Sequence, residues 1–196
     1  SESLPLSGVH RLPNGRQVRY LRNSVKATVD AVTGDTQLYM VDPADPLIQA
    51  YARGFPTLFR DLAEIPAELG RHLRYSRVLL ELQAEVLTRF HQESPPVFHG
   101  QQDRWDLATE LSTNPALPVA YRAEYGLLDL PGSGDEEAYV LSTVFVPQGR
   151  QNLASFLVAQ WVPGEGGRLS LWDAPVEEQI LGPGQIEAMV EQDPEI

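Results

Sequence analysis

The sequence contains no cysteine, which excludes disulfides and thiolate metal sites. Long apolar runs are also missing. The longest, residues 153–162, has ten residues and includes Ser155 and Gln160, whereas a helix that crosses a bilayer needs about 20 apolar residues. We therefore expect no membrane insertion by these 196 residues.

Cations are scarce in the second half of the chain. Residues 1–104 hold 12 Arg and Lys against 12 Asp and Glu, whereas residues 105–196 hold 3 against 15. The net charge of −12 would repel a phosphate backbone, because like charges raise the free energy of association. The composition therefore predicts that nucleic acid is not a partner.

Alternating apolar residues and closely spaced turns predict the fold class. The N-terminal half is expected to form a β-hairpin, residues 18–32 and 36–41, followed by helices. Turns too short for a crossover separate the predicted strands of the C-terminal half, which favours antiparallel pairing. These strands are residues 119–130, 138–146, 153–162 and 168–173, and a helix from Pro183 follows them. The prediction is an α+β fold: an N-terminal β-hairpin with helices, then a C-terminal antiparallel meander of about four strands closed by a helix.

Two helices have clear sequence signals in the N-terminal half. Asp45 is a suitable N-cap residue and Pro46 suits the first helical position, so a helix is expected from residue 46. We expect its apolar face to be buried; that face carries Leu47, Ile48, Tyr51 and Ala52. A longer helix is predicted from Ser76 to about His91, because apolar residues recur there at helical spacing.

A stretch rich in proline and turn residues, 93–118, separates these helices from the predicted C-terminal strands. It predicts two parts, residues 1–104 with the hairpin and helices and residues 105–196 with the antiparallel sheet. We expect the two parts to form one compact unit.

Potential metal ligands gather in one short stretch, His91, Glu93, His99 and Asp103. Imidazole and carboxylate suit zinc or a similar ion, but their spacing matches no known ligand motif. A surface loop with polar residues facing water explains the stretch better. We therefore expect no metal site and keep a metal-dependent hydrolase as an alternative, with His91, His99 and Asp103 as its candidate ligands.

No arrangement of residues predicts a cofactor or an enzyme. Gly182-Pro183-Gly184 before a helix is similar to a phosphate-binding turn, but Glu187 stands where the third glycine of the dinucleotide motif belongs. Its charge would repel a pyrophosphate. We expect no cofactor and no catalytic residues.

Several blocks of the sequence resemble the signature of uncharacterised protein family 0182, a group of large bacterial multi-pass membrane proteins. The blocks are residues 20–31 (YLRNSVKATVDA), 72–75 (HLRY), 145–154 (FVPQGRQNLA), 182–187 (GPGQIE) and 192–196 (QDPEI). They occur in order over nearly the whole chain, and the longer ones are specific.

The resemblance implies a membrane-anchored parent with N-terminal transmembrane helices and a large extracytoplasmic region. This chain is similar to a C-terminal portion of that region. The implied partners are the rest of the parent protein and, beyond it, an envelope protein. The resemblance implies no activity, because the family has no established biochemical function.

Two hypotheses about function follow. The first is a non-catalytic extracytoplasmic domain that mediates interaction within its parent or with an envelope partner. The second is a ligand-binding domain of a transporter-like membrane protein, with Arg22, Asn23, Arg150 and Asn152 as polar anchors, because guanidinium and amide groups suit recognition of carboxylate or phosphate. A pocket lined by two or more of these side chains would favour the second hypothesis.

Overall fold

The structure is a computed structural model that describes residues 4–12, 15–110, 119–130, 137–175 and 177–192. The chain divides into two compact units. Unit 1 comprises residues 1–79 and 161–168, and unit 2 comprises residues 80–160 and 169–196. The expected division at residue 104 stays a prediction.

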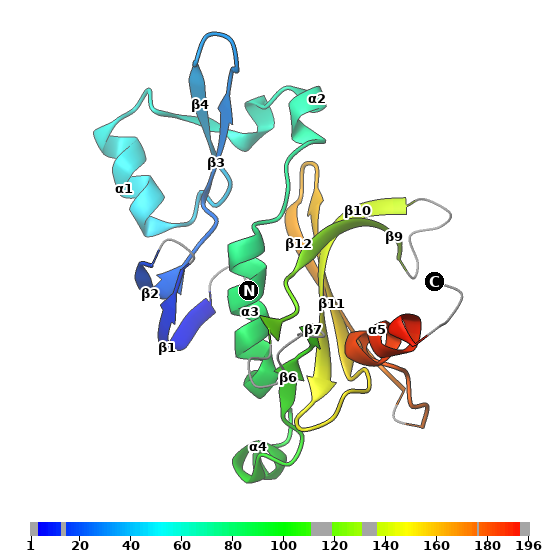
Figure 1. The fold of residues 1–196 in the computed structure, drawn as a ribbon. Helices are drawn as coiled ribbons and strands as arrows, with labels where there is room; N and C mark the ends of the chain where they lie inside the picture. The colour runs from blue at the N-terminus through cyan, green and yellow to red at the C-terminus, as the bar shows by residue number, and fades with distance from the viewer. Residues whose placement is uncertain (1–3, 13–14, 111–118, 131–136, 176, 193–196) are drawn as a thin grey trace. The chain divides into compact units, whose positions relative to one another are not determined.

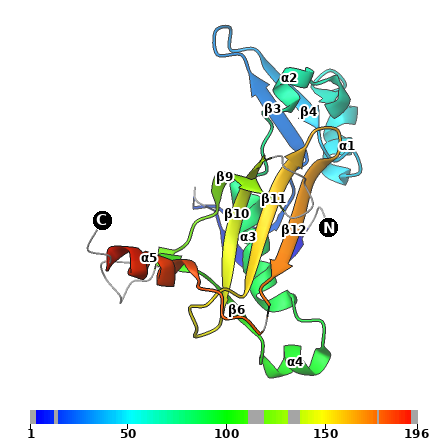
Figure 2. The ribbon, with the colours of Figure 1, turned by 90° about the vertical axis from the view of Figure 1, so that its right-hand side faces the viewer.

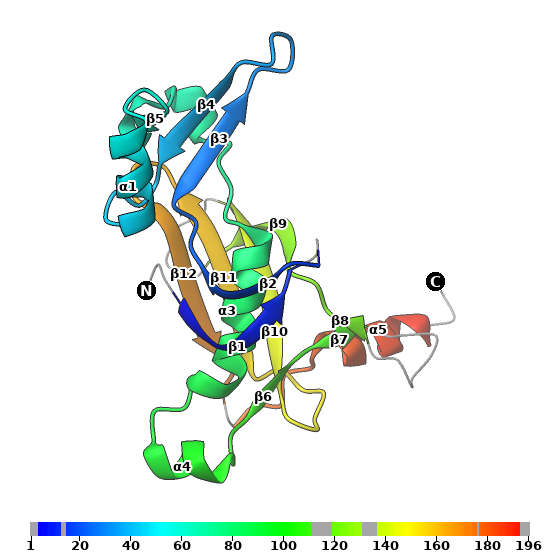
Figure 3. The same ribbon diagram turned by 90° about the vertical axis from the view of Figure 1, so that its left-hand side faces the viewer.

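The strands of unit 1 form two small sheets (Figure 3). β1 (Leu4–Arg11) pairs antiparallel with β2 (Gln17–Leu21). In the second sheet β3 (Val25–Val29) pairs antiparallel with β4 (Thr36–Met40), and β5 (Phe59–Asp61) pairs parallel with β4. The predicted hairpin around Gly34 is thus confirmed, and Gly34 has a φ of 78°, a conformation that favours glycine.

The helices of unit 1 are α1 (Pro46–Gly54), the short 3₁₀ helix η1 (Leu62–Glu64) and α2 (Ala67–Gly70). α1 begins where the sequence predicts, with Asp45 as N-cap. The predicted burial of its apolar face is wrong. No residue of α1 is buried, and Leu47 and Tyr51 are 63% and 55% exposed. Ile48 and Ala52 on the same face are half-buried. The physical reason is that apolar periodicity identifies the apolar face of a helix but does not determine how much of that face is covered.

Unit 2 is built on an antiparallel sheet whose strands lie side by side in the order β12-β11-β10-β6 (Figure 2). β9 pairs with the first part of β10, and β6 pairs with its last part along the same edge. The strands are β6 (Trp105–Leu107), β9 (Glu124–Asp129), β10 (Glu137–Pro147), β11 (Ser155–Val162) and β12 (Gly166–Asp173). Residues 161–168, at the tip of the β11–β12 hairpin, belong to unit 1.

The core of unit 2 lies between this sheet and the helix α3 (Arg77–Phe90), which covers one face of it (Figure 1). Its most deeply buried large side chains are Leu80, Val140, Leu141, Phe145, Leu157 and Val158. Burial of each apolar side chain contributes about 1.5–3 kcal/mol before the entropy of folding is subtracted. The predicted α+β fold with a C-terminal antiparallel sheet is confirmed.

Smaller elements complete unit 2. They are α4 (Pro95–Gly100), the paired strands β7 (Thr109–Glu110) and β8 (Val119–Ala120), and the final helix α5 (Pro183–Glu191), which contacts β7. Among the described residues, every helix is too short or too polar to cross a membrane.

Candidate functional site

The loop that links β10 to β11 is fixed by hydrogen bonds on both sides. Gly149 adopts a φ of 73°, and the Arg150 amide donates to the Pro147 carbonyl at 2.9 Å, which closes a tight turn. The Leu153 amide donates to the Ile180 carbonyl at 2.8 Å. The side chains at positions 150–152 are therefore carried by a backbone that is held at both ends.

Gly182 packs directly against this loop. A Cβ atom added at Gly182 would lie 2.0 Å from the carbonyl oxygen of Gln151, so no other residue fits there without a backbone shift. The Gly182 amide is capped by the side chain of Gln185 at 3.1 Å. Two of the blocks that carry the family resemblance, residues 145–154 and 182–187, thus meet in space.

These two blocks line a pocket of about 660 Å³ together with residues from β6 and from the chain that follows β12. We call it the Arg150 pocket. Its walls include Asp103, Trp105, Arg150, Gln151, Asn152, Asp173, Glu178, Gln179 and Gln185. Three carboxylates, one guanidinium and four side-chain amides face one volume, so the pocket is rich in hydrogen-bonding groups and its net charge is negative.

Trp105 gives this pocket a rigid wall. Its indole is 7% exposed and stacks on the His91 ring with the centroids 3.5 Å apart, while Phe145 lies at 5.3 Å. His91 is held in turn by a hydrogen bond between its Nδ1 and the Leu87 carbonyl, 2.7 Å long. Because these contacts already hold the Trp105 ring, the ring loses little conformational entropy when a ligand binds against it.

The candidate metal ligands do not gather around one point. His91 Nε2 lies 3.9 Å from Asp103 Oδ2, whereas His99 lies exposed on α4 with its ring edge-on to Phe98. Within the part of the chain that the structure describes, no three His, Asp or Glu side chains are placed to hold a metal ion.

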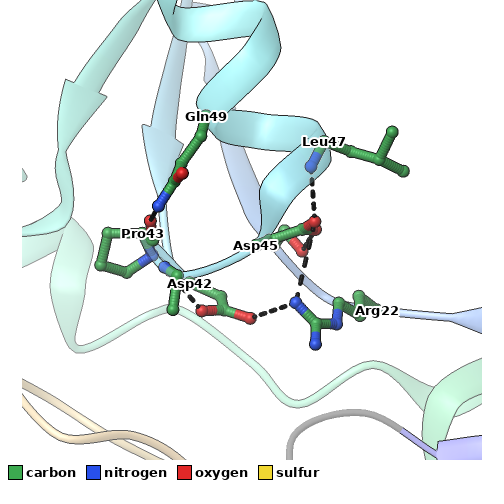
Figure 4. Close-up of polar contacts among 8 residues, drawn as sticks. Arg22, Asp42, Pro43, Asp45, Leu47 and Gln49 are labelled. Carbon is green, nitrogen blue, oxygen red and sulfur yellow. Dashed lines mark hydrogen bonds and ion pairs between the residues drawn. The ribbon is translucent and has the colours of Figure 1, made fainter.

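The other two candidate anchors, Arg22 and Asn23, lie in unit 1. Arg22 contacts both Asp42 and Asp45 (Figure 4). Its Nη1 is 3.2 Å from Asp42 Oδ2 and 3.7 Å from Asp45 Oδ1. Asn23 lines a hollow of about 150 Å³. Because two carboxylates already balance its charge, Arg22 is engaged in holding the fold.

Asp45 is the centre of this network. Its carboxylate is 5% exposed, accepts hydrogen bonds from the Ser24 hydroxyl and the Leu47 amide, and caps α1. Burial would raise the pKa of Asp45, but the hydrogen bonds from Ser24 and Leu47 and the charge of Arg22 hold it below the ordinary value of 3.8. A lowered folded-state pKa contributes stability above pH ~4, and this contribution is lost as the pH falls through that lower pKa.

The structure therefore brings Arg150 and Asn152 together in one pocket and engages Arg22 in an internal ion pair. Sequence reasoning missed the opposite wall of the pocket. Gln185 stands in a recognised block and could have been included. Asp173 ends β12, and Glu178 and Gln179 follow it; none of the three belongs to a motif, so no signal in the sequence pointed to them.

Comparison with known proteins places the whole chain in one family. The model of an uncharacterised protein family, UPF0182, matches residues 1–196. A UPF0182 protein of Microcystis aeruginosa is 40% identical over 94% of this chain, and one of Methanospirillum hungatei is 38% identical over 93%. A UPF0182 protein of Salinibacter ruber is 39% identical over the full chain.

These relatives are much longer than the chain. It covers 19%, 20% and 21% of their respective lengths, so it spans about a fifth of each. No solved structure matches it.

Proposed function

The chain belongs to the uncharacterised family UPF0182, and we propose that it is a non-catalytic ligand-binding domain on the extracytoplasmic side of a larger multi-pass membrane protein. The observation that carries this proposal is the Arg150 pocket, in which two of the anchors expected from the sequence, Arg150 and Asn152, line one volume. The pocket favours ligand binding over interaction alone as the role of unit 2.

Interaction with the rest of the parent is the second part of the proposal. Large apolar side chains are exposed on α1, where Leu47 and Tyr51 stand four residues apart, and at Phe55 directly after it. On α5, Ile186 and Met189 are 50% and 62% exposed. Exposed apolar faces favour association, because burying them removes apolar area from water. The chain spans only about a fifth of its relatives' length, so the remaining four-fifths offer a partner for these faces.

The location can be tested with a cysteine, since this chain has none of its own. Val32 is 94% exposed in the turn between β3 and β4, so Val32→Cys presents a thiol to water without disturbing a contact. In intact cells that express the full-length protein with this substitution, we expect a membrane-impermeant maleimide to label it. The unsubstituted full-length protein controls for cysteines elsewhere. Labelling that needs prior permeabilisation of the cells would contradict an extracytoplasmic location.

The chemistry of the Arg150 pocket indicates the kind of ligand. Three carboxylates against one guanidinium disfavour an anion, whereas four amides can each donate and accept hydrogen bonds. A volume of about 660 Å³ lies within the range of about 300–1,000 Å³ typical of small-molecule sites. The pocket therefore suits a small polar ligand that is neutral or positively charged.

Titration of the 196-residue chain with three probes tests this selectivity. The probes are a neutral disaccharide, spermidine and citrate, and the readout is the NMR signals of the side-chain amides of Gln151, Asn152 and Gln185. We expect the disaccharide or spermidine to shift these signals and citrate to leave them unchanged. Asn152→Ala should weaken that binding about 3- to 10-fold, since one hydrogen bond contributes about 0.5–1.5 kcal/mol.

Asn23→Ala is the matched control for this titration, because it removes the same side chain from unit 1. It should leave the affinity unchanged. Stronger shifts with citrate than with either other probe, or equal effects of the two asparagine variants, would contradict the proposed pocket.

A further inference from the structure

A second, smaller hollow in unit 2 has the opposite charge. It lies where α3 and α4 end and has a volume of about 120 Å³. Its lining residues are Arg89, Gln92, Phe98, His99, Gln101 and Arg104. We call it the basic pocket. Two guanidiniums and an imidazole line it without any carboxylate, in a chain whose net charge is −12.

One guanidinium donor of the basic pocket, Arg104 Nε, is buried and has no hydrogen-bond partner among the described residues. Arg71 and Arg168, by contrast, each lie within 4.0 Å of a carboxylate oxygen. Arg22 Nε is also buried without a hydrogen bond, but the Nη1 of that residue is paired with Asp42. A buried N–H group that has left water without gaining an acceptor costs about 1–3 kcal/mol, so this site is incomplete as it stands.

The backbone around the basic pocket is fixed. Gln92 Nε2 donates to the Asp103 carbonyl at 2.7 Å, which ties the end of α3 to the chain entering β6. Gln101 ends α4 with a φ of 49°, and among the described residues it is the only non-glycine with positive φ. Such a conformation is costly unless the surrounding structure holds it, and it gathers at binding sites more often than elsewhere.

Helix termini explain part of this charge. Cations near the last turn of a helix interact favourably with its C-terminal carbonyls, and Arg89 and His99 occupy such positions on α3 and α4. Arg104 does not, because it stands on neither helix. Asp103 beside it lines the Arg150 pocket and not the basic pocket. An acceptor for Arg104 is therefore still needed.

We propose that the basic pocket binds a phosphate group, with Arg89 and Arg104 as its charged donors and His99 or Gln101 as further donors. Guanidinium matches the oxygens of phosphate in a paired arrangement and its charge strengthens each hydrogen bond. A hollow of about 120 Å³ is far below the ~300 Å³ of a site for a whole drug-sized ligand, so it holds one charged group and leaves the rest of the molecule outside.

Titration of the 196-residue chain with inorganic phosphate tests the site, with the NMR signals of the Gln92 and Gln101 side chains and the Arg104 Nε as readout. We expect saturable shifts at these positions. Arg104→Gln should weaken phosphate binding about 10- to 100-fold and Arg89→Gln to a similar extent, because each variant removes a charge-assisted hydrogen-bond donor. Arg89 is exposed, so its variant should keep the fold.

Arg168→Gln is the matched control, because it removes the same charge from an exposed ion pair with Glu165 in unit 1. It should leave phosphate affinity within about twofold of the unchanged chain, since exposed ion pairs contribute little. Absence of saturable shifts, or equal weakening by Arg168→Gln and Arg104→Gln, would overturn the proposal.

Vesicles distinguish the source of the phosphate. If the group belongs to a lipid, the chain should sediment with phosphatidylcholine vesicles that contain phosphatidic acid, and Arg104→Gln should abolish this. If it belongs to a free molecule, inorganic phosphate should bind while the same vesicles leave the chain in solution. Because the basic pocket shares no residue with the Arg150 pocket, its failure would leave the proposed function standing.

Discussion

Replacing Gly182 by alanine is expected to lower the free energy of unfolding by about 3 kcal/mol. The new Cβ atom would lie 2.0 Å from the Gln151 carbonyl oxygen, far inside contact distance, and that oxygen belongs to backbone that cannot rotate away. The start of α5 must then move off the loop between β10 and β11. Urea denaturation of Gly182→Ala followed by circular dichroism measures this loss. Since the two segments share the Arg150 pocket, ligand binding there should weaken together with stability.

Gly184→Ala is the control for this substitution, because it makes the same change two residues further along. Its Cβ would lie 3.4 Å from the Thr109 carbonyl oxygen, an ordinary contact. Alanine also suits a helix better than glycine by about 0.5–1 kcal/mol, so the net change should be small. Equal losses from both variants would show that the close approach at Gly182 is not what joins the two segments.

Replacing Asp45 by alanine should lower the free energy of unfolding by about 3 kcal/mol as well. Loss of an N-cap costs about 1 kcal/mol, and loss of one partner of a buried, hydrogen-bonded ion pair costs more than that. Without the carboxylate, the Ser24 hydroxyl and the Leu47 amide lose their acceptor and Arg22 keeps only Asp42. Thermal and urea unfolding of Asp45→Ala at pH 7 measure the change.

Asp61→Ala measures the cost of losing a helix cap alone, without the loss of an ion pair. Asp61 also caps a helix, η1, with a hydrogen bond from the Ala63 amide at 2.9 Å, but this bond is exposed and none of its partners is an arginine. The variant should cost about 1 kcal/mol. If Asp45→Ala costs no more than Asp61→Ala, the network of Arg22, Ser24 and Asp45 contributes nothing beyond a cap.

Local signals explain why much of the fold could be predicted. Asp45 followed by Pro46 begins α1, and Gly34 marks the hairpin between β3 and β4, because both effects act within a few residues. Pairing between residues far apart in the sequence could not be predicted from these local signals. Residues 18–32 were expected to form one extended strand, whereas the structure divides them into β2 and β3. The break lies at Arg22 and Ser24, whose partners Asp42 and Asp45 are about 20 residues away.

The same distinction applies to the candidate sites. Arg150 and Asn152 stand two residues apart on one loop, so their joint position in a pocket follows from local sequence. The carboxylates that give the pocket its charge come from residues 103, 173 and 178, and only the folded sheet brings them together. The role of Arg22 could not be predicted for the same reason. Its side chain was expected to bind a ligand, but it forms ion pairs with Asp42 and Asp45.

Unit 1 is assembled from two separate stretches of chain, residues 1–79 and 161–168. Lys26 donates a hydrogen bond to the Arg74 carbonyl, and its ammonium lies 4.8 Å from the ring centre of Trp161. During synthesis on the ribosome, the first stretch emerges long before this aromatic partner exists. A nascent chain therefore cannot complete unit 1 until residues 161–168 have left the exit tunnel. A shortened gene that stops at residue 79 would deprive Lys26 of Trp161 permanently.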